Sequence, residues 1–405
     1  MDNPLVSIVL TNYNGEKYVM ETIESVFRQT YENWELIIVD DCSTDQSYNT
    51  LNQLKDPRIK IVQTERNGQV SAAHNAGNRL AAGRYIACID NDDSWFPDKL
   101  MKQVLFMEEH PEIGACFTLP IIIDDAGRVV EGTPFEQLFY VDNKSRHEWL
   151  HEMLISGSHL LNSSSLVRRD ALEDIGDNNL CLIQLHDYEI WVRMALKYEL
   201  YLIKEKLVLY RRFEGSNSLS QTNRINTIRA ELEFSWIIGT TIRDMEPSEF
   251  KKVFYREMVN PEASSETEIA CEKAILLTRD YLHGDCRFYA FEMFDSLLRK
   301  QEAADLLYKK YHLSQHDVYK MTGCPILYTH ETKQEFQGMI DELAKVKEEN
   351  QALMKMCMQK NEENLKLLKE KTEMENSTSW KVTKPLRKTG NLLKTIEQRA
   401  RKQDG

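Results

Sequence analysis

Four polar residues at the end of a short apolar run are the first candidates for chemistry. Residues 85–89 are followed directly by Asp90, Asn91, Asp92 and Asp93. Carboxylates crowded in this way repel one another, so a turn, solvent or a bound cation must offset the repulsion. Mg²⁺ and Mn²⁺ prefer carboxylate oxygen and need few protein ligands when substrate phosphates supply the others. A polar turn after a strand is the alternative interpretation.

A second acidic group ends another apolar run, in "IIVDDCSTD". Asp41 could accept hydrogen bonds from the polar edge of a base or from a ribose. Ser43 or Thr44 suits the cap of a following helix. The two functions are compatible, because the cap uses hydroxyl groups and leaves the carboxylate for a ligand.

The elements that must position these residues alternate between strands and helices. Short apolar runs separated by helical stretches predict a parallel sheet with helices on both faces. Ligands of such sheets bind beyond the carboxyl ends of the strands, where the polar clusters of this sequence fall. The predicted strands are residues 6–10, 34–40, 58–64, 84–90 and 113–124, and the predicted helices between them include residues 16–29 and 67–83.

Composition narrows the class of protein. The 405 residues allow two or three domains, and 42% hydrophobic with 28% charged residues suits a globular protein with a substantial core. The net charge of −13 argues against general nucleic-acid binding. Eight scattered cysteines form no CxxC pair, which argues against a zinc ribbon and favours a reducing, cytosolic compartment. We expect neither a signal peptide nor a membrane-spanning helix.

The rest of the chain changes character several times. After residue 126 the pattern is mixed, with a predicted helix at 187–198 and a predicted strand pair within "LYLIKEKLVLYRR". We predict a catalytic domain over residues 1–215, a helical region over 216–330, a coiled coil over 331–377 and a basic amphipathic tail over 378–405.

The predicted coiled coil depends on a heptad pattern between residues 336 and 367. Asn350 is a polar core residue that favours one register, and a homodimer is the expected product. A single solvated helix is the alternative. The two heptad positions are occupied by Phe336, Leu343, Asn350, Cys357 and Asn364, and by Met339, Val346, Leu353, Lys360 and Leu367.

The last segment reverses the charge balance. From Lys381 onward there are eight Lys or Arg residues and two acidic residues, and Trp380 stands just before them among interleaved aliphatic residues. Such a stretch can lie on an anionic membrane surface. A disordered basic tail is the competing interpretation.

Five ordered motifs resemble family 2 glycosyltransferases with the GT-A fold. They are "VSIVLTNYN", "QTYENWELIIVDDCSTDQS", "NGQVSAAHNAG", "YIACIDNDDSWFPDKL" and "LHDYEIWVRMAL". The resemblance covers about residues 4–215, roughly half of the chain. It implies an α/β fold with a mostly parallel sheet, followed here by the helical region and the coiled coil.

The resemblance also implies residue functions. Asp92 matches the metal ligand, and Asp90 matches a ligand of the donor ribose or of the metal shell. Asp93 would support the site. The metal, Mg²⁺ or Mn²⁺, would neutralise the leaving nucleoside diphosphate. The residues assigned to the nucleotide sugar are Thr11, Tyr13, Asn14, Asp41, Gln69, Asp90, Asn91 and Arg211.

Asp187 falls on the catalytic-base position of the family. A carboxylate there can take the proton of an acceptor hydroxyl as that hydroxyl attacks the anomeric carbon. A helix cap is the alternative function for this residue.

Three departures from the family pattern occur. His186 replaces an acid beside the base and would favour the ionised form of Asp187. Phe213 stands where a histidine is common, which leaves Arg211 or Arg212 to reach the diphosphate. His74 replaces a common arginine and is expected to face the sheet or the cleft.

The expected function is metal-dependent, inverting transfer of a sugar from a nucleoside diphosphate to a saccharide or lipid-linked saccharide in surface polysaccharide assembly. The expected location is cytoplasmic, with the tail at the inner face of the plasma membrane. The main alternative is a scaffold on a degenerate transferase domain that acts through its coiled coil. A nucleotidyltransferase of similar architecture is a third, weaker alternative. That class needs a glycine-rich phosphate loop near the N-terminus, and the segment "TNYNGEKY" contains only one glycine, which argues against it.

Overall fold

A computed structural model gives the fold of residues 3–213 and 224–322, and of scattered helical positions between residues 345 and 374, of which 369–374 are consecutive. The chain divides into two compact units, Met1–Gly323 and Cys324–Gly405. Most of the predicted coiled coil and all of the predicted tail lie outside the described residues, although residues 371–374 are helical. The candidate site lies in the first unit.

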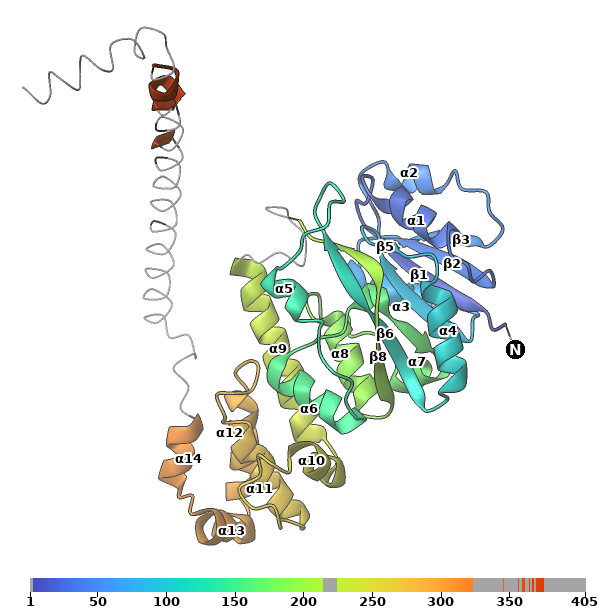
Figure 1. Cartoon of the computed structure of the whole chain (residues 1–405). Helices are drawn as coiled ribbons and strands as arrows, with labels where there is room; N and C mark the ends of the chain where they lie inside the picture. Colours follow the sequence, from blue (N-terminus) through green and yellow to red (C-terminus); the bar gives the residue numbers. More distant parts are fainter. Residues whose placement is uncertain are drawn as a thin grey trace, which may run out of the picture. The chain divides into compact units, whose positions relative to one another are not determined.

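The first unit is built on a mixed sheet with the strand order β3-β2-β1-β4-β7-β6-β8-β5 (Figure 1). The buried, apolar lengths of β1 and β2 identify them as central strands. The strands are β1 (Val6–Asn12), β2 (Trp34–Asp40), β3 (Ile59–Gln63), β4 (Tyr85–Asp90), β5 (Ser94–Trp95), β6 (Ile113–Ile123), β7 (Leu166–Arg168) and β8 (Glu199–Arg211).

Helices form where apolar residues recur at helical spacing; in the first helix, for example, Val19, Ile23 and Val26 are buried. The helices of the sheet-containing part are α1 (Val19–Phe27), α2 (Ser47–Leu51), α3 (Gln69–Leu80), α4 (Lys99–Glu109), α5 (Pro134–Gln137), α6 (Arg146–Ser156), α7 (Arg169–Ile175) and α8 (His186–Ala195), with a 3₁₀ turn at Asn162–Ser164. Those that follow are α9 (Arg224–Asp244), α10 (Pro247–Phe254), α11 (Glu266–Leu276), α12 (Arg287–Leu298), α13 (Gln301–Tyr311) and α14 (Gln315–Thr322).

Helices cover both faces of the sheet, as the sequence predicts. The Tyr85 hydroxyl donates to Glu108 of α4. The next residue of β4, Ile86, lines a small cavity with His74 of α3 and Trp191 of α8. Because successive side chains of a strand point to opposite faces, α4 lies on one face and α3 and α8 lie on the other.

The half of the sheet formed by β3, β2, β1 and β4 is parallel. Its register places the polar ends of three strands level with one another, because Asn12 pairs with Asp40 and Thr11 pairs with Asp90. The polar clusters that follow β1, β2 and β4 therefore meet at one edge, where the sequence places the ligand site.

The other half corrects the sequence prediction. The expected strand pair at residues 200–212 is one long strand, β8, which runs parallel to β6 with register shifts near Thr118 and Leu119. The short strands β5 and β7 were not predicted, and both pair in antiparallel fashion. A three-residue strand carries too little apolar pattern to be recognised in the sequence.

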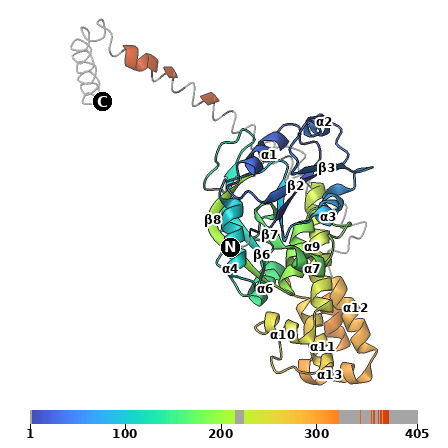
Figure 2. The same cartoon turned by 90° about the vertical axis from the view of Figure 1, so that its right-hand side faces the viewer.

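Helices α10 to α14 pack as a group at one end of the first unit, next to α6 and α9 (Figures 1 and 2). Helices α9 and α12 approach closely, since a Cβ atom at Gly239 would lie 2.1 Å from a ring carbon of Tyr289. Ile237, Ile238 and Ile242 of α9 belong to the same buried cluster as the sheet residues. The helical region and the sheet therefore share one core.

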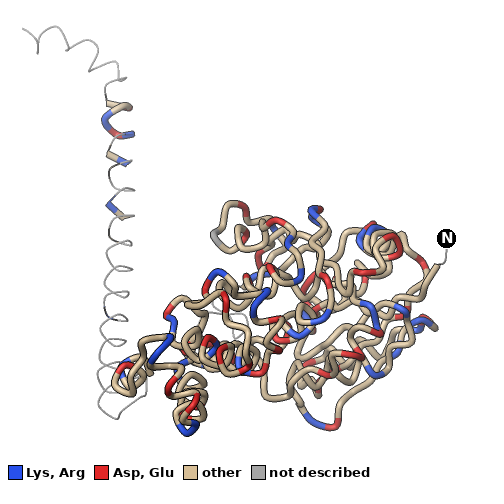
Figure 3. Tube along the Cα trace, turned by 90° about the horizontal axis from the view of Figure 1, so that it is seen from below, with Lys and Arg blue, Asp and Glu red and all other residues tan. Residues whose placement is uncertain are grey.

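Acidic and basic residues are interspersed along the described trace (Figure 3). None of the helices in the described part of the chain is both long and apolar enough to cross a membrane.

Candidate active site

A cavity of about 780 Å³ opens at the carboxyl ends of β1, β2 and β4. Residues from α3, from the segment before α8 and from the end of β8 complete its lining. The structure brings all of the sequence-predicted site residues to this one cavity. They are Thr11, Tyr13, Asn14, Asp41, Gln69, Asp90, Asn91, Asp92, Asp187 and Arg211.

Asn12 connects the two polar strand ends of the parallel half, and sequence reasoning missed it. Its side-chain amide donates to Asp40 at 2.7 Å, and its carbonyl oxygen accepts from Asn91 at 2.9 Å. A buried amide can supply both donors and an acceptor, so one side chain joins the end of β2 to the acidic loop after β4. The sequence does contain a signal for this function, because Asn12 is a polar residue at the end of the apolar strand β1.

Gly15 packs directly against the hydrogen bond between Asn12 and Asn91. A Cβ atom at Gly15 would lie 2.3 Å from both Asn12 Oδ1 and Asn91 Nδ2, a separation that real Cβ atoms do not show. The preceding residue, Asn14, has a φ of 51°, and its side-chain oxygen accepts from the Thr44 backbone at 2.8 Å. The turn after β1 is thus held against the turn after β2.

Asp41 is buried at the cavity wall and fixes the start of α3. Its Oδ1 atom accepts from Thr64 Oγ1 and from the Gly68 backbone, each at 2.9 Å. The expected capping by Ser43 or Thr44 does not occur, because α2 begins at Ser47 without a side-chain cap. The Ser43 hydroxyl instead donates to the carboxylate of Asp40 at 2.6 Å.

The end of β4 and the acidic loop after it hold three carboxylates: Asp93 is buried, and Asp90 and Asp92 are partly buried. Burial raises the pKa of Asp90, and burial together with the Asp90 charge raises the pKa of Asp92 to about 7. The pKa of Asp93 is also raised, by burial and then by the charges of Asp92 and Asp90. Ser163 partly compensates by donating to Asp90 at 2.9 Å. Charged forms that repel one another in this way favour a divalent cation.

The carboxylates at the end of β4 would supply only some of the ligands of a metal ion. Among the residues that the structure describes, no three His, Cys, Asp or Glu side chains are arranged as a closed metal cage. A site with one or two carboxylates nevertheless fits Mg²⁺ or Mn²⁺, which take their other ligands from water and substrate phosphates. Asp92 lines the cavity where such a substrate would lie.

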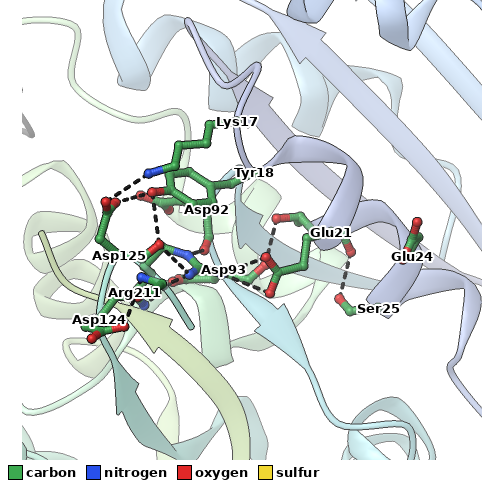
Figure 4. Close-up of polar contacts among 12 residues, drawn as sticks. Lys17, Tyr18, Glu21, Glu24, Ser25, Asp92, Asp93, Asp124, Asp125 and Arg211 are labelled. Atoms are coloured by element: carbon green, nitrogen blue, oxygen red, sulfur yellow. Dashed lines mark hydrogen bonds and ion pairs between the residues drawn. The ribbon is translucent and has the colours of Figure 1, made fainter. Parts of the chain in front are cut away.

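Arg211 lines the cavity, and its guanidinium is bonded to other groups of the protein. Its guanidinium donates to both Glu21 carboxylate oxygens at 2.9 and 2.8 Å, to the Asp92 carbonyl at 3.0 Å and to the Asp124 carbonyl at 3.1 Å (Figure 4). Its backbone N–H donates to Asp93 at 2.9 Å. Arg211 therefore holds the acidic loop in place, and its donors are occupied.

Asp187 is the second residue of α8 and lines the cavity. Its Oδ1 atom accepts from the Tyr188 N–H at 2.8 Å, and Leu185 is the cap residue, so the simple cap interpretation does not apply. Glu233 of α9 accepts from three consecutive backbone N–H groups just before α8, with the shortest bond, 2.8 Å, from Leu185. A residue outside the five motifs thus positions the segment that carries Asp187.

A second cavity, of about 20 Å³, lies behind Asp187. His186 and Asp187 line both cavities and so form the wall between them. The His186 ring stacks on His74 at 5.5 Å, and burial with the nearby His186 lowers the pKa of His74 to about 3. His74 therefore faces the small cavity as a neutral side chain.

The chain is similar in sequence to known glycosyltransferases and in fold to solved ones. The model of the family described as glycosyl transferase family 2 matches residues 7–176. TuaG of Bacillus subtilis, named as a teichuronic acid biosynthesis glycosyltransferase, is 45% identical over 108 residues, 26% of this chain and 43% of that protein. An uncharacterized glycosyltransferase of Methanocaldococcus jannaschii, MJ1057, is 31% identical over 229 residues, 55% of this chain and 76% of that protein.

WfaP of Escherichia coli, a UDP-Glc:alpha-D-GlcNAc-diphosphoundecaprenol beta-1,3-glucosyltransferase, is 41% identical over 104 residues, 26% of this chain and 41% of that protein. The chain thus spans less than half the length of TuaG and WfaP. Among solved structures, TarS 1-349 of S. aureus in complex with UDP-GlcNAc shares the fold, with a TM-score of 0.50 at 18% identity over 78% of this chain and 89% of that chain. The chain belongs to glycosyl transferase family 2.

Proposed function

We propose that this protein is a metal-dependent, inverting glycosyltransferase of surface polysaccharide assembly. It moves a sugar from a nucleoside-diphosphate sugar to a saccharide or lipid-linked saccharide acceptor. The observation that carries the proposal is that Asp92 and Asp187 line one cavity with the polar ends of β1 and β2. The names of TuaG and WfaP support the assignment to polysaccharide assembly.

The parallel half of the sheet binds the nucleotide. Tyr13 lines the cavity with 49% of its surface exposed, so its ring is available to stack on a base. Asp41 and Asn14 are held in place by the surrounding turns and present polar atoms to the base or ribose. Gln69 and Asn91 line the same wall and complete the polar contacts.

Asp92 would hold a divalent cation, and Asp90 would support it or bind the ribose. A bound cation would supply Lewis-acid stabilisation of the leaving diphosphate. Arg211 keeps the acidic loop in position through the Asp92 carbonyl and the Asp93 carboxylate. The backbone at Asp92 is thereby fixed, and its side chain lines the cavity.

Asp187 acts as the general base. As the acceptor oxygen bonds to the anomeric carbon, the Asp187 carboxylate takes the proton of that hydroxyl. The bond between the anomeric carbon and the diphosphate oxygen breaks, and its electron pair leaves with the nucleoside diphosphate. One displacement with one base inverts the anomeric configuration.

A donor screen tests this function. The protein is incubated with UDP-, dTDP- and GDP-sugars, with Mg²⁺, Mn²⁺ or EDTA and with a lipid-linked saccharide acceptor, and the released nucleoside diphosphate is measured. We expect turnover of one donor that requires metal and is lost in Asp92→Asn. A chain that neither turns over nor binds any donor, by thermal shift with metal present, would instead support the scaffold alternative.

The C-terminal segments have separate proposed functions. Residues 336–367 dimerise the protein, and the tail from 378 to 405 contacts a membrane surface at the cytoplasmic side. Deletion of residues 336–405 is expected to convert the dimer into a monomer, as measured by light scattering, and to abolish sedimentation with anionic vesicles. An unchanged dimer or unchanged sedimentation would contradict the corresponding function.

A further inference from the structure

The cavity is rich in acidic residues. Its described lining includes five carboxylates and two cationic side chains, Lys17 and Arg211. A nucleoside diphosphate adds further negative charge, and one divalent cation cannot balance this excess. A cationic side chain that can turn toward the diphosphate would reduce the repulsion.

Arg211 cannot supply that charge without breaking its own contacts. Its side chain is 1% exposed, and Glu21 accepts from it with both carboxylate oxygens. The Tyr18 ring covers the guanidinium at 4.4 Å from the ring centroid. Moving a buried, paired charge of this kind is costly, so Arg211 stays with the acidic loop.

Lys17 is in the opposite situation. Its side chain is 63% exposed, and its Nζ atom lies 2.8 Å from the carboxylate of Asp125, which is itself 59% exposed (Figure 4). An ion pair between exposed groups contributes little to stability, so Lys17 can exchange this partner for another anion. Both residues line the cavity.

The backbone beside Lys17 is well placed for this exchange. The N–H groups of Tyr18 and Val19 donate to the Gly15 carbonyl at 3.0 and 2.9 Å, which fixes the turn that carries Lys17. The Tyr18 hydroxyl donates to Asp125, so Asp125 keeps a partner when the ammonium leaves. The side chain can therefore move while the surrounding wall stays in place.

We propose that Lys17 binds the diphosphate of the donor and that Asp125 is its partner in the free protein. The proposal rests on the proposed function, because it assigns the ligand of the same cavity. It adds a phosphate-binding residue that lies outside the acidic motifs. Donor binding exchanges the Lys17–Asp125 pair for a Lys17–phosphate contact, with no covalent change.

The test compares ligands that differ only in phosphate. Dissociation constants are measured by calorimetry with Mg²⁺ for UDP, UMP and uridine, and for the GDP and dTDP series, in the wild type and in Lys17→Met. We expect Lys17→Met to weaken diphosphate binding by about tenfold and to leave nucleoside binding unchanged. Lys17→Arg, which keeps the charge, should retain most of the affinity.

Two further variants sharpen the result. Asp125→Asn should bind the diphosphate more tightly than the wild type, because Lys17 no longer has to leave a carboxylate. Lys102→Met is the matched control. Lys102 is a partly exposed lysine that is also paired with carboxylates, those of Asp98 and Glu205, and it does not line the cavity. Its diphosphate affinity should equal that of the wild type.

The outcomes separate the two proposals. Diphosphate binding by the wild type that is unchanged in Lys17→Met would overturn the assignment of Lys17 and leave the proposed function standing. An equal loss for uridine and UDP would also overturn it, because the substitution would then have disturbed the whole cavity. A wild type that binds none of the diphosphates would overturn the proposed function and this inference together.

Discussion

The two halves of the sheet contribute to the same cavity in different ways. In the parallel half, neighbouring strand ends position one another through Asn12, Asp40 and Asn91, at bond lengths between 2.7 and 2.9 Å. In the mixed half, Asp187 and Arg211 depend on partners far away in the sequence, namely Glu233 and Glu21. The strand ends of the parallel half therefore hold one another, whereas the site residues of the mixed half are held by side chains of helices, Glu233 of α9 and Glu21 of α1.

The difference suggests a division of labour. Strand ends that fix one another form a rigid wall, which suits recognition of a nucleotide with constant features. Asp187, the proposed general base, is positioned by Glu233 of α9, a helix outside the sheet. A change in the sequence or position of α9 would move Asp187, which suits acceptors of different shape. Function on a shared fold is set by such sites rather than by the fold itself.

The largest expected effect is in the mixed half. Asp187→Asn should lower kcat by about 10²- to 10⁴-fold, because the amide cannot take the acceptor proton. Donor affinity, measured by calorimetry with metal present, should stay within error of the wild type. A comparable loss of donor affinity would contradict the comparison, in which the parallel half binds the donor and the mixed half supplies the catalytic base.

Glu233 gives the next largest effect and separates positioning from folding. Glu233→Ala should lower kcat by about tenfold or more and reduce stability, because three partly buried backbone N–H groups lose their acceptor. Glu233→Gln keeps an acceptor oxygen and should recover much of the activity with little change in donor KM. Glu231→Ala, at an exposed position of the same helix, is the control. Equal loss of kcat and of donor affinity would place Glu233 in a purely structural role.

Gly15→Ala tests the parallel half. The added methyl group would displace the Asn12–Asn91 bond, so we expect weaker donor binding and a loss of stability of about 1–3 kcal/mol. Chemical denaturation measures the stability and calorimetry the affinity, while single-turnover kinetics at saturating donor should show kcat nearly unchanged. A selective fall in kcat would show that this turn acts on chemistry after all.

The smallest effect concerns pH and metal. The folded-state pKa of Asp92, about 7, lies above its ordinary value of 3.8, so its ionisation opposes folding as pH rises between these values. Its contribution to the stability of the metal-free protein is thus fully present below the lower value and lost above the higher one. In the proposed assignment Mg²⁺ binds the ionised carboxylate of Asp92, so the rise in Tm caused by Mg²⁺ should shrink as pH falls from 8 to 5.5. A pH-independent rise in Tm would exclude Asp92 as the ligand.

Much of the parallel half was predictable from sequence. The continuous apolar runs identified its strands, and the polar residues at their ends identified the cavity wall. The prediction failed for β8, read as two strands, and for β7, which is only three residues long. Patterns with a period of two or 3.6 residues carry no information about register shifts or about short strands that pair only within a sheet.

The amino-acid sequence by itself indicated that the polar ends of β1, β2 and β4 meet at one edge of the sheet, because strand periodicity and polar strand ends are local properties of the chain. The resemblance to the family added Asp187 and Arg211, and the structure added Asn12 and Lys17. Only the tertiary structure decided how those residues are used. It directs the Arg211 guanidinium to Glu21, brings Glu233 to the start of α8 and leaves Lys17 on an exchangeable carboxylate. These assignments depend on burial and on partners more than 45 residues away in each case, as the separations of 190, 48 and 108 residues show, and no local pattern encodes them.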